Sequence, residues 1–143
     1  MIIMGVDPGF AITGYGILEY RNNKLKLLEV GAVETKAREL FTWRLLQIDE
    51  KLTELLRKHE PDAFAFEELF FNNNAKTAIA AAQGRGVAVM AAVKCGIPVY
   101  EYTPLQVKQA VTGYGRADKN QVQQMVKAIL HLDRIIKPDD AAD

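Results

Sequence analysis

Two short apolar runs, each ending in carboxylates, predict the strands on which the fold is built. Residues 2–6 are followed by Asp7 and by the turn-forming pair Pro8-Gly9, and residues 63–66 are followed by Glu67 and Glu68. Apolar runs of this length, bounded by turn or polar residues, are typical of strands buried on both faces. Strand alternation places Asp7 on the face of Gly5, and Glu67 on the face of Ala63 and Ala65.

The residues between these two runs predict an antiparallel meander and a helix. Strand-forming residues at 13–20, a polar break at 21–24 and a further run at 25–35 are typical of strands joined by a hairpin. Residues 38–59 carry apolar side chains at steps of three and four, which predicts an amphipathic helix. A helical crossover makes the strands at 2–7 and 63–68 parallel neighbours, so Asp7 and Glu67 should emerge together at the carboxyl edge of the sheet.

The second half of the chain predicts three more helices and a fifth strand. Asn74 and its neighbours form a turn and helix cap, and Asp118 with Gln121 has the spacing of a capping box. The expected helices are at 75–94, from Pro104 onward, and from 119 to about 130, and the expected strand is at 97–102. We therefore predict one α/β domain over residues 1–143, with an antiparallel meander, further parallel strands and a crossover helix that covers one face of the sheet.

Composition limits the classes of function. With 49% hydrophobic and 25% charged residues the chain is globular, its apolar runs are too short to span a bilayer, and it lacks a signal peptide, so we expect a soluble cytoplasmic protein. One cysteine and two histidines argue against a disulfide and against a Cys/His zinc site. The net charge is zero, but residues 104–137 carry six basic and two acidic residues, which favours one face that meets phosphate, although solvated helix faces explain it too.

Four acids form a candidate metal site. A helix is predicted to begin at Pro138. Asp140 and Asp143 are three residues apart in it, so their side chains would lie on the same face of that helix. Together with Asp7 and Glu67 they provide an all-oxygen set, which selects Mg²⁺ or Mn²⁺, and two such ions could clamp a phosphodiester. The alternatives are that Asp7 caps the Pro8-Gly9 turn and that Asp139 and Asp140 favour the helix dipole.

Other residues near this edge allow two interpretations each. Phe70 and Phe71 could stack on nucleic-acid bases or fill the core. Arg116 and Lys119 flank a helix N-terminus, where they could bind an anion or form a solvated surface. Gly14 and Gly16 could permit a close approach of backbone or ligand, or they could mark a bulge or a twist, which we favour. The small residues of the helix at 75–94 suit close packing on the sheet or against a second copy of the chain. We favour both, because apolar residues occupy more than one face of this helix.

Several spaced motifs resemble those of the RuvC-type Holliday junction resolvases, in the ribonuclease H-like superfamily. They are Gly5-Val6-Asp7-Pro8-Gly9 with Thr13-Gly14-Tyr15-Gly16, Phe64-Ala65-Phe66-Glu67, Gln83-Gly84-Arg85-Gly86-Val87-Ala88, Gln106-Val107-Lys108-Gln109, Lys119-Asn120-Gln121-Val122 and Asp140-Ala141-Ala142-Asp143. The resemblance implies a ribonuclease H-like α/β fold, with a five-stranded mixed sheet flanked by helices on both faces. It also implies a nuclease that binds Mg²⁺ or Mn²⁺, two ions per site. It implies a homodimer that nicks opposed strands of a four-way DNA junction, with branch-migration proteins of the RuvA and RuvB type as partners.

By the same resemblance, the catalytic metal ligands fall on Asp7, Glu67, Asp140 and Asp143, and Glu68 is not one of them. Phe70 takes the place of a base-contacting aromatic residue, and Lys108 and Lys119 take the places of junction-binding lysines. We count Arg85 and Arg116 as further candidates for DNA contacts. The family's last helix continues past the second Asp, whereas a helix from residue 138 would stop at 143 after barely one turn, so we expect the last helix to be truncated here.

Two other classes of protein share part of this pattern. Actin-like and sugar-kinase ATPases also open with a strand, an Asp and a Gly-containing turn, but they need two such domains to enclose a nucleotide. A non-catalytic DNA-binding module would keep the basic patch and would have no use for four acids.

Overall fold

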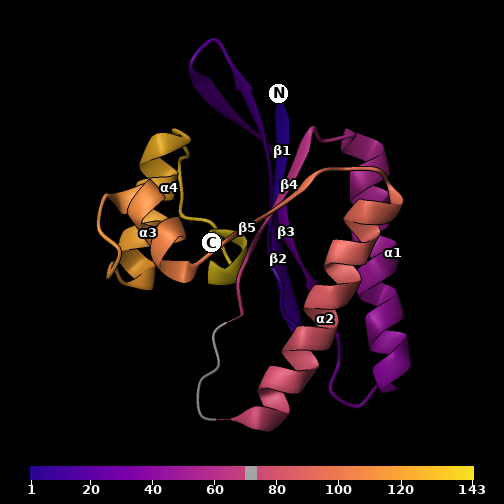
Figure 1. Cartoon of the computed structure of the whole chain (residues 1–143). Helices are drawn as coiled ribbons and strands as arrows, with labels where there is room; N and C mark the ends of the chain where they lie inside the picture. Colours follow the sequence, from indigo (N-terminus) through magenta and orange to yellow (C-terminus); the bar gives the residue numbers. More distant parts are fainter. Residues whose placement is uncertain (70–73) are drawn as a thin grey trace.

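A mixed five-stranded sheet lies at the centre of the computed structural model, which describes residues 1–69 and 74–143 (Figure 1). The strand order is β3-β2-β1-β4-β5, with β1, β2 and β3 antiparallel and β1, β4 and β5 parallel. The strands are β1 (Ile2–Asp7), β2 (Ile12–Arg21), β3 (Lys24–Glu34), β4 (Ala63–Glu67) and β5 (Val99–Tyr102). The predicted meander with two added parallel strands is therefore confirmed.

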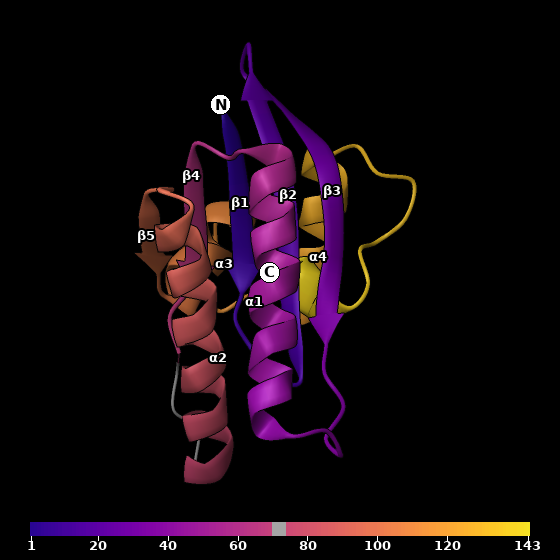
Figure 2. The same ribbon diagram turned by 90° about the vertical axis from the view of Figure 1, so that its right-hand side faces the viewer.

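Helices cover both faces of the sheet, as predicted. The helices α1 (Phe41–His59) and α2 (Ala75–Lys94) lie side by side on one face, and α3 (Pro104–Thr112) and α4 (Lys119–Ile129) lie on the other (Figures 1 and 2). A single 3₁₀ turn, η1 (Asp139–Ala141), packs against β2 on the α3–α4 side. The last predicted helix is thus one 3₁₀ turn in the structure.

The main hydrophobic core lies between the sheet and the α1–α2 layer. Met4 and Phe64 point from neighbouring strands into this core and are fully buried with Ile48, Leu52 and Leu55 of α1. From α2 the core receives Ala88, Ala91 and Ala92, whose small side chains let the helix approach the sheet closely. Since Met4 and Phe64 point into this core, Gly5, Asp7, Ala65 and Glu67 project from the opposite face.

The helix boundaries follow local capping chemistry. Asn74 caps α2, with its side chain accepting a hydrogen bond from the Thr77 amide, and Asp118 and Gln121 form the predicted capping box of α4. A second capping box, between Thr103 and Gln106, opens α3. The largest boundary differences are at α1, which begins at Phe41 instead of residue 38, and at β5, which begins at Val99 instead of residue 97. In the part of the chain that the structure describes, no helix has the length and apolar character needed to cross a membrane.

Candidate active site

Asp7 and Glu67 lie at the same level on neighbouring parallel strands. The register pairs Gly5 with Ala65 and Val6 with Phe66, and one further step brings Asp7 opposite Glu67. On the face covered by α3 and α4, the residue two positions before each acid is small: Gly5 in β1 and Ala65 in β4. No bulky side chain therefore stands beside the two carboxylates on this face. The predicted meeting of two acids at the carboxyl edge of the sheet is present in the structure.

The turn η1 brings Asp140 to the same place by packing on Gly14 of β2. Gly14 pairs with Asp7 across the β1–β2 ladder, and a methyl group on Gly14 would overlap the carbonyl of Asp140. Glycine is required here because backbone approaches backbone. The register shift of the β2–β3 pair lies instead at Ile17/Leu18, so the bulge interpretation of Gly14 was wrong.

Burial and neighbouring negative charges make the carboxyl groups of Asp7, Glu67 and Asp143 difficult to ionise. Burial, followed by the charges of Glu67, Asp143 and Asp140, raises the pKa of Asp7 from 3.8 to about 7. The pKa of Glu67 is raised by burial and by Asp143, and that of Asp143 by burial, with Asp139 and Asp140 adding to it. The four acids predicted as ligands therefore share one electrostatic neighbourhood, although they come from three separate segments of the chain.

Lys108 and Lys119 supply positive charge to this neighbourhood. The charge of Lys119 lowers the pKa values of Asp7, Glu67 and Asp143, and Lys108 acts in the same direction on Glu67 and Asp143. Both predicted phosphate-binding lysines thus lie near the acids. Lys119 is also ion-paired, with its Nζ 2.5 Å from Oδ2 of Asp139.

Asp139 was not recognised as part of this neighbourhood from the sequence. From the sequence, Asp139 was interpreted only as an acid that favours the dipole of a helix starting beside it. In the structure its carboxylate accepts a hydrogen bond from Lys119 and so joins η1 to the first turn of α4. Lys119 and Asp139 are twenty positions apart in the sequence, and no helix or strand periodicity connects positions so distant. The only signal in the sequence was that Asp139 directly precedes Asp140, the first of the two acids predicted as ligands in this segment.

The other candidates for DNA contacts are placed differently. Arg85 forms an ion pair with Glu101 of β5 and stacks on the Phe66 ring at 4.7 Å, on the α2 face of the sheet and away from the acids. Arg116 is exposed in the connection between α3 and α4. Phe70 and Phe71 lie outside the described residues.

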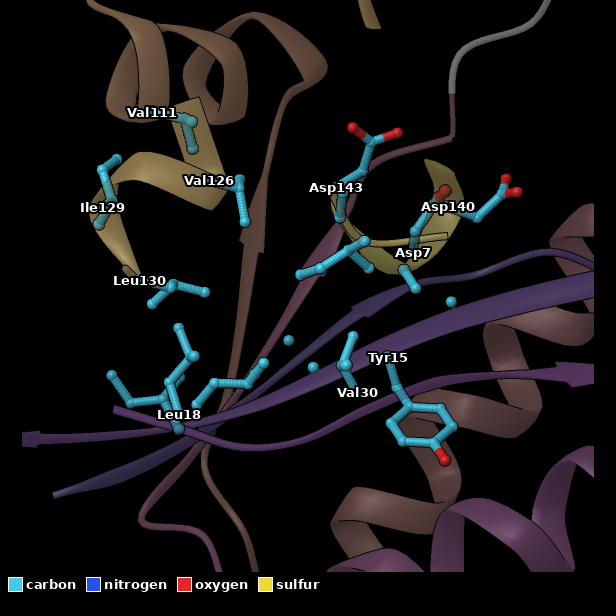
Figure 3. Close-up of a pocket in the computed structure, with 18 of the residues that line it drawn as sticks. Asp7, Tyr15, Leu18, Val30, Val111, Val126, Ile129, Leu130, Asp140 and Asp143 are labelled. Carbon is cyan, nitrogen blue, oxygen red and sulfur yellow. The ribbon is translucent and has the colours of Figure 1, made fainter. Parts of the chain in front are cut away.

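The carboxylates fit a hard cation by their chemistry, but they are not closed around one point. Within residues 1–69 and 74–143, no three His, Cys, Asp or Glu side chains are arranged to hold an ion as they stand. Figure 3 shows why, since the side chains of Asp140, in η1, and Asp143, two residues after η1, point in different directions above Asp7. The donors are all oxygens and repel one another, which suits Mg²⁺ or Mn²⁺ and disfavours softer metals.

An apolar cavity of about 300 Å³ opens beside the acids, between the sheet and the α3–α4 layer. Leu18 and Val30 line it from the sheet, Val111 from α3, and Val126 and Ile129 from α4. Asp7, Asp140 and Asp143 lie at one end of it (Figure 3). The cavity gives the acids a poorly solvated side, in keeping with the raised pKa of Asp7.

Comparison with known proteins identifies the family. The family model described as crossover junction endodeoxyribonuclease RuvC matches residues 3–143. The chain belongs to the RuvC family. The proteins of that name from Ruminiclostridium cellulolyticum and Alkaliphilus metalliredigens are 61% and 54% identical over 143 residues, covering all of this chain and 86% and 87% of theirs. The structure of Thermus thermophilus RuvC in complex with a Holliday junction substrate superposes with a TM-score of 0.94 at 36% identity, over all of this chain and 87% of that one.

Membership of the RuvC family decides between the functions left open by the sequence. It confirms a nuclease of the Holliday junction resolvase class, and it disfavours an ATPase lobe and a non-catalytic DNA-binding module. RuvC proteins are metal-dependent nucleases, so an acid cluster at this edge of the sheet suits the family's chemistry.

Proposed function

We propose that residues 1–143 act as one nuclease domain that resolves four-way DNA junctions by hydrolysing a phosphodiester on each of two opposed strands. The observation that carries this proposal is the convergence of Asp7, Glu67, Asp140 and Asp143 at one sheet edge, beside Lys108 and Lys119. Acids alone would not attract a polyanion, and lysines alone would not cleave it, so the combination supports a nuclease.

In this proposal the four acids are the ligands of Mg²⁺ or Mn²⁺, two ions per site. When bound, these ions would activate the attacking water and stabilise the departing oxygen. Asp7 lies between Glu67 on its own sheet and Asp140 on η1, so it would hold the metal together with acids on both sides of it. The burial that makes ionised Asp7 costly in the free protein would favour its binding to a divalent cation.

The lysines and Phe70 have separate roles in the proposal. Lys108 and Lys119 bind junction phosphates close to the acids, and Arg116 extends that contact from the α3–α4 connection. Phe70 contacts an unstacked base at the crossover. Arg85 has the weakest support, because Glu101 and Phe66 already occupy its guanidinium.

A homodimer forms, in this proposal, through the outer face of α2. Exposed positions on this helix recur at alternating steps of four and three, and they are Ile79, Gln83, Gly86, Met90 and Val93. This is the spacing with which one helix packs along another. Nothing in the described chain lies within 4 Å of a Cβ placed on Gly86, so a second backbone could approach there. A branch-migration complex of the RuvA and RuvB type stays a prediction from the family resemblance.

The substitution Asp7→Asn tests the assignment of the acids. We expect Mg²⁺-dependent cleavage of a synthetic four-way junction to fall more than about hundredfold, because an amide is a poor ligand for hard cations. Junction binding in EDTA or Ca²⁺ should persist, since the phosphate contacts come from other residues. Undiminished cleavage by this variant would remove Asp7 from the site.

Glu67 and Glu68 provide a matched pair of controls. Glu67→Gln should lose cleavage as Asp7→Asn does, whereas Glu68→Gln changes the same charge one residue further on and should keep it. Four-way junction, duplex DNA and ATP should be compared as substrates in Mg²⁺. Preferential cleavage of the junction supports the proposal, and turnover of ATP alone would favour the ATPase interpretation.

A further inference from the structure

The ion pair between Lys119 and Asp139 lies at the border of the proposed metal site. Lys119 is the first residue of α4 and Asp139 the first residue of η1, directly before Asp140. The Nζ–Oδ2 distance is 2.5 Å, while the Lys119 side chain is 70% exposed and that of Asp139 is 36% exposed. The pair is therefore open to solvent.

Asp139 is distinct from the four proposed metal ligands in its electrostatic role. Its carboxylate raises the pKa of Lys119 through a direct hydrogen bond, and that bond lowers the pKa of Asp139 itself. By contrast, Lys119 lowers the pKa values of Asp7, Glu67 and Asp143 only through its charge, without a hydrogen bond to them. The ammonium of Lys119 thus already has one anionic oxygen as its partner, and a DNA phosphate would offer another.

The ion pair is not what holds η1 in place. Gln123, one helical turn after Lys119, donates a hydrogen bond of 3.1 Å to the carbonyl of Ile136, and Ala141 is buried against the sheet. Within the turn, the amides of Ala142 and Asp143 donate to the Asp139 carbonyl. The carboxylate of Asp139 can therefore lose Lys119 while the backbone of η1 stays in position.

From this arrangement we propose that Asp139 is an intramolecular substitute for a DNA phosphate. It occupies Lys119 in the free protein, and a junction phosphate must displace it to reach the same Nζ. The inference rests on the proposed role of Lys119 in junction binding. Asp139 thereby weakens the binding of the junction, and it keeps Lys119 beside the acids until DNA arrives.

The test is the dissociation constant of a four-way junction in EDTA, measured for the intact chain and for Asp139→Asn. An exposed ion pair is worth little, so we expect Asp139→Asn to bind the junction about two- to fivefold more tightly at low salt. The gain should shrink as salt screens the pair in the wild-type protein. The EDTA removes any contribution of metal binding or cleavage to the result.

A double-mutant cycle distinguishes competition for Lys119 from a general change of charge. In a Lys119→Gln background, Asp139→Asn should have no effect on the dissociation constant. The control Asp133→Asn removes the same charge from an exposed position six residues earlier and should leave the constant within about twofold of wild type. Thermal melts of each variant establish that all are folded.

Each outcome bears on the inference. A gain that persists in the Lys119→Gln background would overturn it, because Asp139 would then act as bulk charge. Weaker binding by Asp139→Asn would overturn it too, because Asp139 would then position Lys119 for DNA. The proposed function is tested separately, by the binding of the junction to the wild-type chain. Failure of the wild-type chain to bind would contradict the proposed function, whereas the Asp139 variants test only the competition for Lys119.

Discussion

At the scale of single residues, the free protein carries a buried carboxylate whose ionisation costs stability. The pKa of Asp7 is about 7 in the folded chain and 3.8 when unperturbed. Between these values the folded protein holds a proton that the unfolded chain has lost, so the free energy of unfolding falls as pH rises from about 4 to 7. Glu67 and Asp143 contribute in the same direction, because their pKa values are raised as well.

The raised pKa of Asp7 predicts that the stability of the metal-free protein depends on pH. In EDTA, raising the pH from 5 to 8 should reduce the contribution of Asp7 to the free energy of unfolding by about 1 to 2 kcal/mol, allowing for partial solvation of the group. Asp7→Asn should remove this contribution, leave the smaller dependence due to Glu67 and Asp143, and make the protein more stable than wild type at pH 8. Urea unfolding at the two pH values measures both effects.

Divalent metal provides the complementary measurement. At pH 8, Mg²⁺ should stabilise the wild-type protein by mass action, by about 2.7 kcal/mol at one hundred times its dissociation constant. Asp7→Asn should gain much less from the same addition, whereas the control Glu68→Gln should gain as much as wild type. Equal stabilisation of wild type and Asp7→Asn would contradict the role of Asp7 as a ligand.

At the scale of elements, the contact between η1 and β2 decides whether Asp140 reaches the site. Gly14→Ala would place a methyl group into the Asp140 carbonyl, and we expect a loss of about 1 to 3 kcal/mol in the free energy of unfolding. Cleavage should fall more steeply than stability, because displacing η1 moves Asp140 and Asp143 relative to Asp7. Urea unfolding and junction cleavage by the folded fraction measure the two effects separately.

Gly16→Ala is the matched control on the same strand and the same face. A Cβ on Gly16 would lie 4.0 Å from the Ala141 carbonyl, which is an ordinary contact. This variant should keep its stability within about 0.5 kcal/mol and keep its cleavage. Equal losses in the two variants would mean that glycine is needed for the strand itself and not for the approach of η1.

The same elements show how much of the structure the sequence could predict. Apolar runs and strand-forming residues predicted the five strands, and apolar steps of three and four predicted α1. The caps at Asn74 and at Asp118 with Gln121 marked the starts of α2 and α4, because all these features depend on near neighbours. The approach of η1 to Gly14 and the Lys119–Asp139 pair depend on contacts between distant segments, which local patterns do not encode. Asp7 and Glu67 were the exception, since a helical crossover made their strands parallel neighbours.

At the scale of the whole molecule, the proposed homodimer depends on the outer face of α2. The side chains of Ile79, Met90 and Val93 on this face are 61%, 55% and 55% exposed, which leaves apolar surface without an intramolecular partner among the described residues. Two copies of the chain packed through this face would bury it and leave both acid clusters accessible, because those clusters lie on the opposite side of each sheet. Opposed strands of one junction could then be cleaved by the two sites.

Met90→Lys is the direct test, because it places a charge at the middle of this face. The wild-type chain should sediment as a dimer of about 32 kDa, twice the chain mass of 16.0 kDa, and Met90→Lys should sediment as a monomer. The control Leu105→Lys adds the same charge at an equally exposed apolar residue of α3, on the other side of the sheet, and should remain a dimer. With Met90→Lys, junctions should be nicked on one strand at a time, because the two sites are no longer coupled. A dimeric Met90→Lys would place the interface elsewhere, and a monomeric wild type would leave paired cleavage without a structural basis.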